Sequence, residues 1–203
     1  MGFVNLNMGI KEGWHAFYKF MKKDTWASLA VTLFIAFLVI KFIFFPVLSL
    51  LTGTSLPLVI VESCSMYHDE YGEGGLKAVL DNSVYSNRGI NYETSGNWNF
   101  RGGMNKGDVV FVIGAGSTEV GDVLIFDSNR GEAHPIIHRI VGIDSETGET
   151  TTKGDHNSAI YPFDKNIKKD QLVGKAVFRI PLVGWAKLIF FEKSRDPEDR
   201  GFC

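Results

Sequence analysis

Cysteine and excess positive charge are both scarce in this sequence. The 203 residues include two cysteines, Cys64 and Cys203, too few for the disulfide framework of a small secreted domain. Lys and Arg number 21 against 23 Asp and Glu, and the resulting net charge of −2 argues against a nucleic-acid partner. Neither the P-loop nor the Rossmann glycine pattern occurs. The sequence therefore gives no reason to expect nucleic acid or a nucleotide cofactor.

A long hydrophobic segment begins at Trp26. Trp26–Ile40 carries no charge, and Phe42–Leu51 is apolar after the single Lys41. Because a helix rises about 1.5 Å per residue and the hydrocarbon core is about 30 Å thick, about 20 residues can cross a bilayer. The segment predicts a transmembrane anchor over residues 25–52, ended by Pro46 and Gly53. It is too long for the apolar region of a cleaved signal peptide.

Residues 1–24 form a short amphipathic lead before the anchor. Four lysines precede the anchor, at Lys11, Lys19, Lys22 and Lys23, whereas only Lys41 lies near its far end. Positive charge is retained on the cytoplasmic side of membrane segments. We therefore expect a cytoplasmic N-terminus and an extracytoplasmic remainder.

After residue 52, short runs rich in β-branched residues are bounded by Gly, Asp or Asn, as is typical of strands. The runs are Leu58–Val61, Val109–Ile113, Val123–Phe126, Ile136–Ile143, Thr150–Thr152 and Leu172–Ile180. Since no long helical segments separate them, they predict an all-β domain, a partly open barrel, over residues 53–180.

Two segments of this region lack the strand pattern. Residues 67–107 are rich in Gly, Asn, Tyr and Glu, with one helical turn expected over Leu76–Leu80, and they predict a surface insertion. Residues 181–203 begin with an apolar segment too short to span a bilayer. We expect this segment either to lie in the membrane interface as a helix or to pack on the β domain, followed by a frayed charged end, Glu192–Arg200.

Several side chains suited to catalysis occur singly in patterns that are also common in structural positions. Ser63 and Ser65 follow the first predicted strand, but Ser-x-Ser is frequent in turns. His138 lies inside a predicted strand, and Asp155 lies in a turn after one. His134 and His138 are separated by Pro135, which argues against a helix, and two histidines alone do not make a zinc site.

In sequence order, the chain presents the anchor and then five short motifs. They are Ser63-Cys64-Ser65-Met66, Gly107-Asp108-Val109-Val110-Phe111-Val112, Gly121-Asp122-Val123-Leu124-Ile125-Phe126, Ile136-Ile137-His138-Arg139-Ile140-Val141 and Thr152-Lys153-Gly154-Asp155-His156-Asn157. As a set, these motifs resemble the type I signal peptidase family, in its archaeal and endoplasmic-reticulum branch. The resemblance covers most of residues 25–190 apart from the insertion.

The resemblance implies roles for four residues. Ser65 would be the nucleophile, and Ser63 would supply a hydroxyl to the oxyanion hole together with the backbone N–H of Ser65. His138 would be the general base, and Asp155 would orient it.

The resemblance also implies an activity and a location. The family has a β-barrel-like catalytic domain at the membrane surface, and it removes signal peptides from exported preproteins after small residues at −1 and −3, without a cofactor. The partners would be preprotein signal peptides, membrane lipid and, in some systems, a secretion translocon or accessory subunits. The protein would lie in the cell membrane or the endoplasmic-reticulum membrane.

The sequence departs from the family pattern near the predicted site. Cys64 replaces a glycine, which makes it an alternative nucleophile. His68 follows Met66 closely where a proline is usual, and it is an alternative base, although Asp69 beside it suggests a solvated loop. Tyr161 occupies the spacing of a second family aspartate, and Asp164 is the nearest substitute.

Two other functions are compatible with parts of the sequence. A self-cleaving repressor-like peptidase would use a Ser–Lys pair and a DNA-binding module, but the anchor and the lack of such a module count against it. A catalytically silent subunit would bind preproteins or a translocon partner without cutting them, and Cys64 and Asp164 favour it. Reaction of Ser65 with a serine-directed probe would distinguish an enzyme from a binding subunit.

Overall fold

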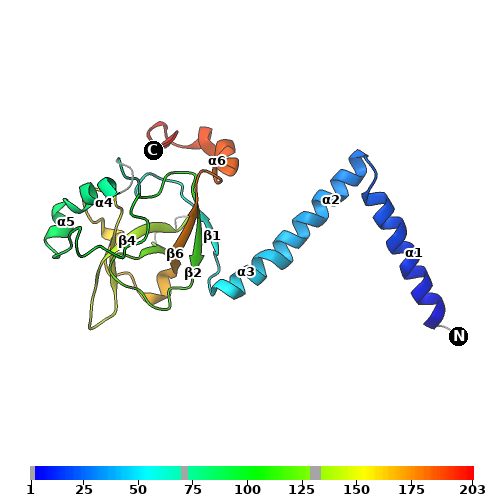
Figure 1. Cartoon of the computed structure of the whole chain (residues 1–203), viewed down its shortest axis with the longest axis horizontal. Helices are drawn as coiled ribbons and strands as arrows, with labels where there is room; N and C mark the ends of the chain where they lie inside the picture. Colours follow the sequence, from blue (N-terminus) through cyan, green and yellow to red (C-terminus); the bar gives the residue numbers. More distant parts are fainter. Residues whose placement is uncertain (1–2, 70–72, 129–133) are drawn as a thin grey trace. The chain divides into compact units, whose positions relative to one another are not determined.

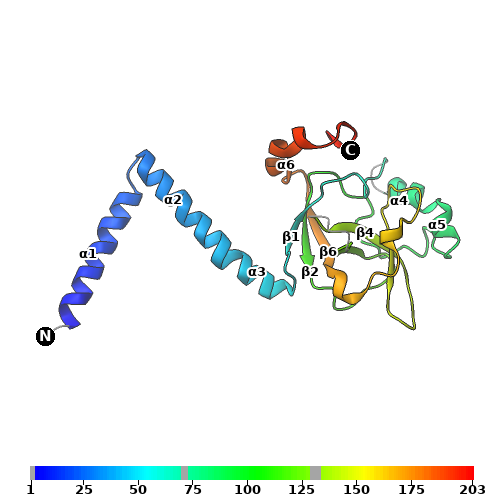
Figure 2. The same ribbon diagram turned by 180° about the vertical axis from the view of Figure 1, so that it is seen from behind.

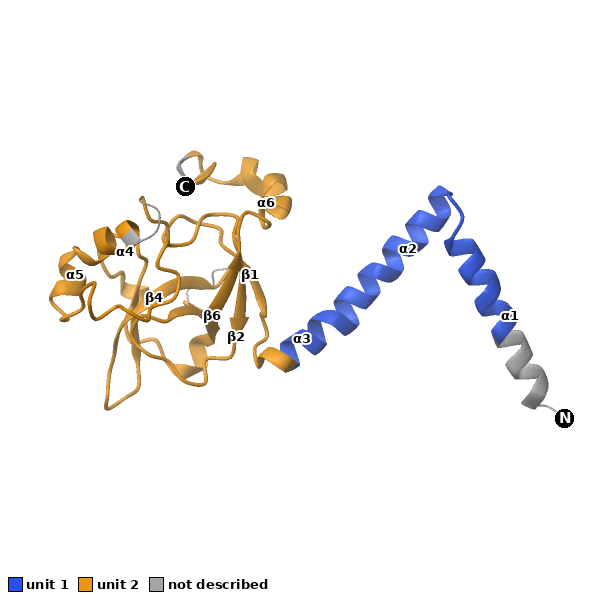
Figure 3. Cartoon of the chain, viewed as in Figure 1, with its two compact units in different colours: residues 1–50 blue, residues 51–203 orange. Residues whose placement is uncertain are grey.

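The computed structural model describes residues 3–69, 73–128 and 134–203. Residues 1–2 of the predicted lead and 70–72 of the predicted insertion lie outside the described residues. The chain divides into two compact units, residues 1–50 and 51–203 (Figure 3).

The first unit is helical. Its helices are α1 (Phe3–Met21), α2 (Trp26–Val39), the π-helical turn η1 (Ile40–Phe44) and α3 (Phe45–Thr52). The last two residues of α3 belong to the second unit. Thr25 caps α2, because its hydroxyl accepts the Ser28 backbone N–H at 3.2 Å. The Ser28 hydroxyl in turn donates to the Met21 carbonyl at 2.9 Å, which satisfies an end group of α1.

The apolar helix continues through Pro46, so the prediction that Pro46 ends it is wrong. Proline lacks an N–H and its ring clashes with the carbonyl four residues earlier in a regular helix. Here the turn before it is widened, since the Phe45 N–H bonds the Ile40 carbonyl. The helix ends at Thr52, and Gly53 follows with φ +68°. By length and composition, Trp26–Thr52 is sufficient to cross a membrane.

The second unit is built on a six-stranded antiparallel sheet with the order β1-β2-β6-β3-β4-β5. The strands are β1 (Leu58–Ile60), β2 (Val109–Ile113), β3 (Val123–Phe126), β4 (Ile136–Ile143), β5 (Thr150–Lys153) and β6 (Leu172–Ile180). The short 3₁₀ helices η2 (Pro162–Asp164) and η3 (Lys169–Gln171) connect β5 to β6. The predicted strands are confirmed to within one residue at each end.

Strand β4 is covered on both faces, and this positions the candidate site. Successive side chains of a strand point to opposite faces. Ile137 and Val141 therefore pack into two clusters on one face, whereas Ile140 packs with Leu124 of β3 on the other. His138 shares the face of Ile140.

The predicted surface insertion packs on the sheet instead. It forms α4 (Glu73–Leu80) and α5 (Ser83–Ser86), which lie beside β4 in both ribbon views (Figures 1 and 2). Leu76 and Tyr85 are fully buried against Val141. The helical turn expected over residues 76–80 is confirmed. The packing was missed because these apolar residues are too widely spaced to form a local pattern.

The segment after β6 is ordered to its end, contrary to the prediction of a frayed tail. It forms α6 (Trp185–Phe191), η4 (Glu192–Ser194) and η5 (Pro197–Asp199). Leu188 of α6 is buried, while Ile189 and Phe190 are exposed. Helix α6 thus packs on the β domain through one side and leaves aromatic and aliphatic side chains uncovered on the other.

Candidate functional site

Ser65 lies just after β1, where the chain turns away from the sheet. Met66 beside it is buried in the main core, and the Met66 carbonyl accepts the Met104 N–H at 2.7 Å. The Ser65 carbonyl accepts the N–H of His156 at 2.9 Å. These contacts hold the carbonyl side of Ser65, and its hydroxyl lies 3.2 Å from the hydroxyl of Ser63.

His138 is buried in β4, opposite Leu124 of β3, and it pairs with Asp164. Its Nδ1 lies 2.6 Å from Oδ1 of Asp164. The same oxygen accepts the Thr152 hydroxyl at 2.7 Å, and Oδ2 accepts the Tyr161 N–H at 3.2 Å. Because an ionised carboxylate only accepts hydrogen bonds, we assign the hydrogen to Nδ1, which leaves Nε2 as an acceptor.

Asp155 binds Arg139 and not His138, contrary to the expectation, and the carboxylate that contacts His138 is that of Asp164. Arg139 Nη2 lies 2.6 Å from Oδ2 of Asp155, and Nε lies 2.9 Å from Oδ1. Alternation along β4 gives the reason: Arg139 faces away from His138, and Asp155 follows β5 on the arginine side. Tyr85 completes the cluster, donating its hydroxyl to Oδ1 at 3.3 Å.

Each titratable group in the Asp155 cluster strongly favours one protonation state. Burial opposes ionisation of Asp155, but Arg139 and the hydrogen bond from His68 outweigh it and hold the carboxyl pKa well below its usual range. Burial likewise opposes the charge on Arg139, and Asp155 reverses this, so the guanidinium pKa is raised. Burial, followed by the charge of Asp155, raises the Tyr85 pKa. Such a fixed pair suits a structural role better than proton transfer.

Two residues that the sequence offered as alternatives are engaged elsewhere. His68, expected in a solvated loop, is buried, with Nε2 2.9 Å from Asp155 Oδ2 and Nδ1 3.1 Å from the Arg101 carbonyl. Both of its ring nitrogens are therefore occupied. Cys64 forms a disulfide with Cys203, so it presents no free thiol as an alternative nucleophile.

Gly154 is the point at which the serine and histidine segments meet. A Cβ placed on it would lie 2.8 Å from both His138 Nε2 and the Ser65 carbonyl oxygen, and 2.5 Å from Asn157 Nδ2. Only glycine leaves room for this approach. The hydrogen bonds of the described residues include none between Ser65 and His138, and such bonds commonly tighten only when substrate binds.

Lys153 braces the turn that contains Gly154. Its buried Nζ donates to the carbonyls of Gly154 and Asp155 at 3.0 and 3.3 Å and lies 4.9 Å from the centre of the Tyr85 ring. Burial lowers the pKa of Lys153 to about 8, although the charges of Asp155 and Asp164 act in the opposite direction. Lys153 holds carbonyl groups and not the Ser65 hydroxyl, which argues against a Ser–Lys pair.

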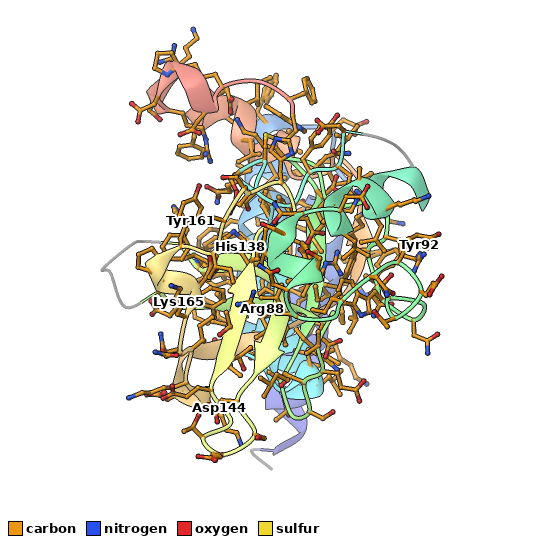
Figure 4. The ribbon with its side chains drawn as sticks, turned by 90° about the vertical axis from the view of Figure 1, so that its left-hand side faces the viewer. Arg88, Tyr92, His138, Asp144, Tyr161 and Lys165 are labelled. Carbon is orange, nitrogen blue, oxygen red and sulfur yellow. A yellow bond between two sulfur atoms is a disulfide. The ribbon has the colours of Figure 1, made fainter. Side chains whose placement is uncertain are left out.

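The serine and histidine line one open cleft of about 640 Å³. Strand β1 forms one wall, and the beginning of β4 forms the other. Ser63 and His134 also lie in the cleft, as does Tyr161, which Figure 4 shows on the same side of the domain as His138. The walls are mainly aliphatic, so the cleft combines an apolar lining with a polar centre.

Sequence reasoning missed three contributors to this site. Thr152 bonds Asp164, and its position in the threonine-rich β5 run was the only available signal. Phe163 stacks on His138 with ring centres 6.1 Å apart. Arg195 reaches the cleft from 133 residues away through Glu62, and no local pattern could have indicated this.

No group of three or more His, Cys, Asp or Glu side chains within the described ranges is placed to hold a metal ion. No protein-family model matches the chain, and a search of curated proteins gave no significant match.

Proposed function

We propose that this protein is a membrane-anchored serine endopeptidase of the signal-peptidase type, which removes N-terminal signal peptides from exported preproteins. The observation that carries the proposal is the 2.6 Å contact between His138 Nδ1 and Asp164, which leaves Nε2 facing the Gly154 turn that binds Ser65. Ser65 and His138 line one cleft and Asp164 binds the far side of the imidazole, which supports the roles of nucleophile, base and orienting acid.

In this mechanism, Ser65 Oγ attacks the scissile carbonyl carbon while His138 Nε2 takes its proton. Asp164 holds the imidazole in the required tautomer and stabilises the imidazolium that forms. The Ser63 hydroxyl and the Ser65 N–H donate to the developing oxyanion. His138 then gives the proton to the leaving amine, and a water molecule activated by the same histidine hydrolyses the ester.

The substrate would bind as an extended strand along β1. Within the described part of the chain, this strand pairs with β2 alone, and its residues line the cleft. An open strand edge can bind a peptide through main-chain hydrogen bonds. The preference for small residues at the −1 and −3 positions is part of the proposal because the motifs resemble those of the signal peptidase family.

The location follows from the helix and the charges beside it. Trp26–Thr52 would be the single membrane anchor, with the lysines of the lead in the cytoplasm and the β domain on the opposite side. The exposed Ile189 and Phe190 of α6 would enter the lipid interface. A disulfide in the β domain fits an oxidising, extracytoplasmic compartment.

The test is cleavage of a purified preprotein by the full-length protein in detergent micelles, with and without membrane extract to supply accessory subunits. Ser65→Ala and His138→Ala should each lower kcat by about 10⁴-fold or more, and Ser63→Ala by about 10²–10³-fold. His156→Ala is the matched control, because this exposed side chain lies outside the cleft and alanine keeps the backbone N–H that donates to Ser65. Retained cutting by Ser65→Ala would place the nucleophile elsewhere.

The Ser63–Ser65 hydroxyl contact favours a second candidate, a silent subunit that binds preproteins or a translocon partner. In this alternative, Ser65 is a turn residue and the cleft holds a peptide without cutting it. The wild-type protein would then bind the preprotein but never cleave it, under any of the conditions above.

A further inference from the structure

The stretch that carries the predicted nucleophile lies between two backbone attachments to the β domain. We call residues 62–65 the nucleophile turn. Just before it, the Val61 N–H donates to the Asp108 carbonyl at 2.9 Å. At its end, the Ser65 carbonyl accepts the His156 N–H at 2.9 Å. The middle of the turn is held from a distant part of the chain, the tail segment, residues 185–203.

The tail segment contacts the nucleophile turn at Glu62 and at Cys64, and Lys187 Nζ lies 3.5 Å from the Glu62 carboxylate. Arg195 donates to the Glu62 carbonyl at 3.0 Å and to the Glu62 carboxylate at 2.6 Å. Cys203 forms the disulfide with Cys64. Ser63 lies between these two attachments and is itself exposed. The position of its hydroxyl therefore depends on where the tail segment is docked.

The docking of the tail segment is specific. The Lys106 side chain is 1% exposed, and its Nζ donates to Glu192 at 2.6 Å and to the Asp199 carbonyl at 2.5 Å. Trp185 Nε1 donates to the Lys106 carbonyl at 3.0 Å, and the Gly201 N–H donates to Glu192 at 2.6 Å. A buried ammonium group is costly without partners, so these contacts define one position for the segment. Figure 2 shows the ribbon of the segment, from α6 to the C-terminus, at the edge of the β domain.

We propose that the tail segment is a positioning element of the catalytic site, which fixes Ser63 and the Ser65 N–H for the oxyanion through the Cys64–Cys203 disulfide. This inference rests on the proposed peptidase function. Oxyanion stabilisation requires donors that are in place before the reaction. The Arg195–Glu62 pair is partly exposed and holds a turn weakly by itself, which makes the disulfide the decisive attachment.

The disulfide also makes this positioning reversible by a dithiol. One thiolate of the dithiol attacks one sulfur of the bond and forms a mixed disulfide, releasing the other cysteine as a thiolate that takes up a proton. The second thiol of the reagent displaces the remaining cysteine. Two electrons pass to the protein, which gains two thiols, and the dithiol becomes a cyclic disulfide. Cys64 and Cys203 are both partly accessible to such a reagent.

The experiment follows preprotein cleavage by the full-length protein in micelles while dithiothreitol is titrated. Thiol labelling and mass measurement give the reduced fraction, and near-UV circular dichroism reports the fold. We expect kcat to fall by about tenfold to a hundredfold as the bond is reduced, with KM changed little because β1 and β4 still form the cleft. The kcat values of Cys64→Ser and Cys203→Ser should equal that of the reduced wild type and should not change when dithiothreitol is added. In the reduced protein, Arg195→Ala should lower kcat further and Arg195→Lys should restore part of it.

Other outcomes would overturn the inference. Unchanged kcat in fully reduced protein would show that the disulfide is inert. A raised KM with constant kcat would make the tail segment a binding wall and not a positioning element. Loss of the near-UV signal together with activity would mean that the disulfide only stabilises the fold in general. Absence of cleavage by the oxidised wild type, before any reductant is added, would instead be a failure of the proposed function.

Discussion

Exchange of the two aspartates for asparagine, one at a time, should separate catalysis from stability. Asp164 accepts from His138, Thr152 and the Tyr161 backbone. In Asp164→Asn, the side-chain amide can direct its NH₂ toward Nδ1 and stabilise the tautomer in which Nε2 carries the hydrogen. His138 then cannot take the proton of Ser65. We expect kcat to fall by about 10³–10⁴-fold, with modest loss of stability.

Asp155→Asn should have the opposite profile. It leaves the Arg139 guanidinium buried without its counter-charge, although carbonyls such as that of Gly121 still accept from it at 2.9 Å. Removal of one partner from a buried ion pair costs about 3–5 kcal/mol of unfolding free energy. At a temperature where the variant stays folded, kcat should remain within about tenfold of wild type, since Asp155 does not touch His138.

The pH dependence of stability gives a second measure of the same difference. The pKa of Asp155 is held below its unfolded value of 3.8, so its contribution is present above that pH and is lost as the pH falls below it. The stability difference between wild type and Asp155→Asn should therefore shrink on acidification below about pH 4.

The assay uses full-length protein in micelles, with cleavage kinetics for turnover and thermal unfolding followed by near-UV circular dichroism for stability. Asn99→Ala, which keeps the backbone carbonyl that Arg139 binds, is a matched control for general effects near the cluster. The reasoning would be refuted by the reverse result. In that case, folded Asp155→Asn would show a kcat about 10³–10⁴-fold below that of the wild type, and Asp164→Asn would keep the wild-type kcat.

Three further results are expected. Gly154→Ala should lower cleavage activity by about 10²-fold or more, because the added methyl group would displace His138. Gly116→Ala is the control and should remain active, since its methyl group would meet no atom within 4 Å. An active Gly154→Ala would contradict the close packing around Gly154. Between pH 8 and 10.5, Lys153 binds more protons in the unfolded chain than in the folded protein. The unfolding free energy of the wild type should therefore rise with pH over this window, by up to about 3 kcal/mol relative to Lys153→Met, in thermal melts. Parallel pH profiles for the two proteins would argue against a lowered pKa of Lys153. In the same melts, Leu76→Ala should lower the unfolding free energy by about 2–5 kcal/mol, because Leu76 is fully buried. Lys77→Ala should change it almost not at all, because Lys77 is exposed. Equal melting temperatures of the two variants would mean that the insertion is not packed on the sheet.

The strands could be predicted from the sequence because their signals are local. Gly107-Asp108 and Gly121-Asp122 each precede a β-branched run, and turn chemistry and strand propensity agree there. Alternation along β4 also places Arg139 on the face opposite His138, where it binds Asp155. Asp155 could not be assigned in the same way, because it lies beyond β5 and the register of β5 against β4 cannot be read from the sequence.

The remaining features depend on contacts between distant residues. Asp164 reaches His138 because η2 folds back on β5, and a short 3₁₀ turn has no sequence pattern that reports its direction. Leu76 and Tyr85 are buried by a helical pair whose apolar residues are sparse. Cys64 and Cys203 are 139 residues apart, so their pairing required the fold itself.

The strand order has a consequence for synthesis. Strand β6 is the last to be made, yet it lies between β2 and β3 in the sheet. Until it emerges, the chain can form a β1–β2 pair and a separate β3–β4–β5 sheet, which are joined through β6. Ser65 belongs to the first part, and His138 with Asp164 to the second. The proposed peptidase activity would therefore arise only after β6 has been made and has joined the two parts of the sheet.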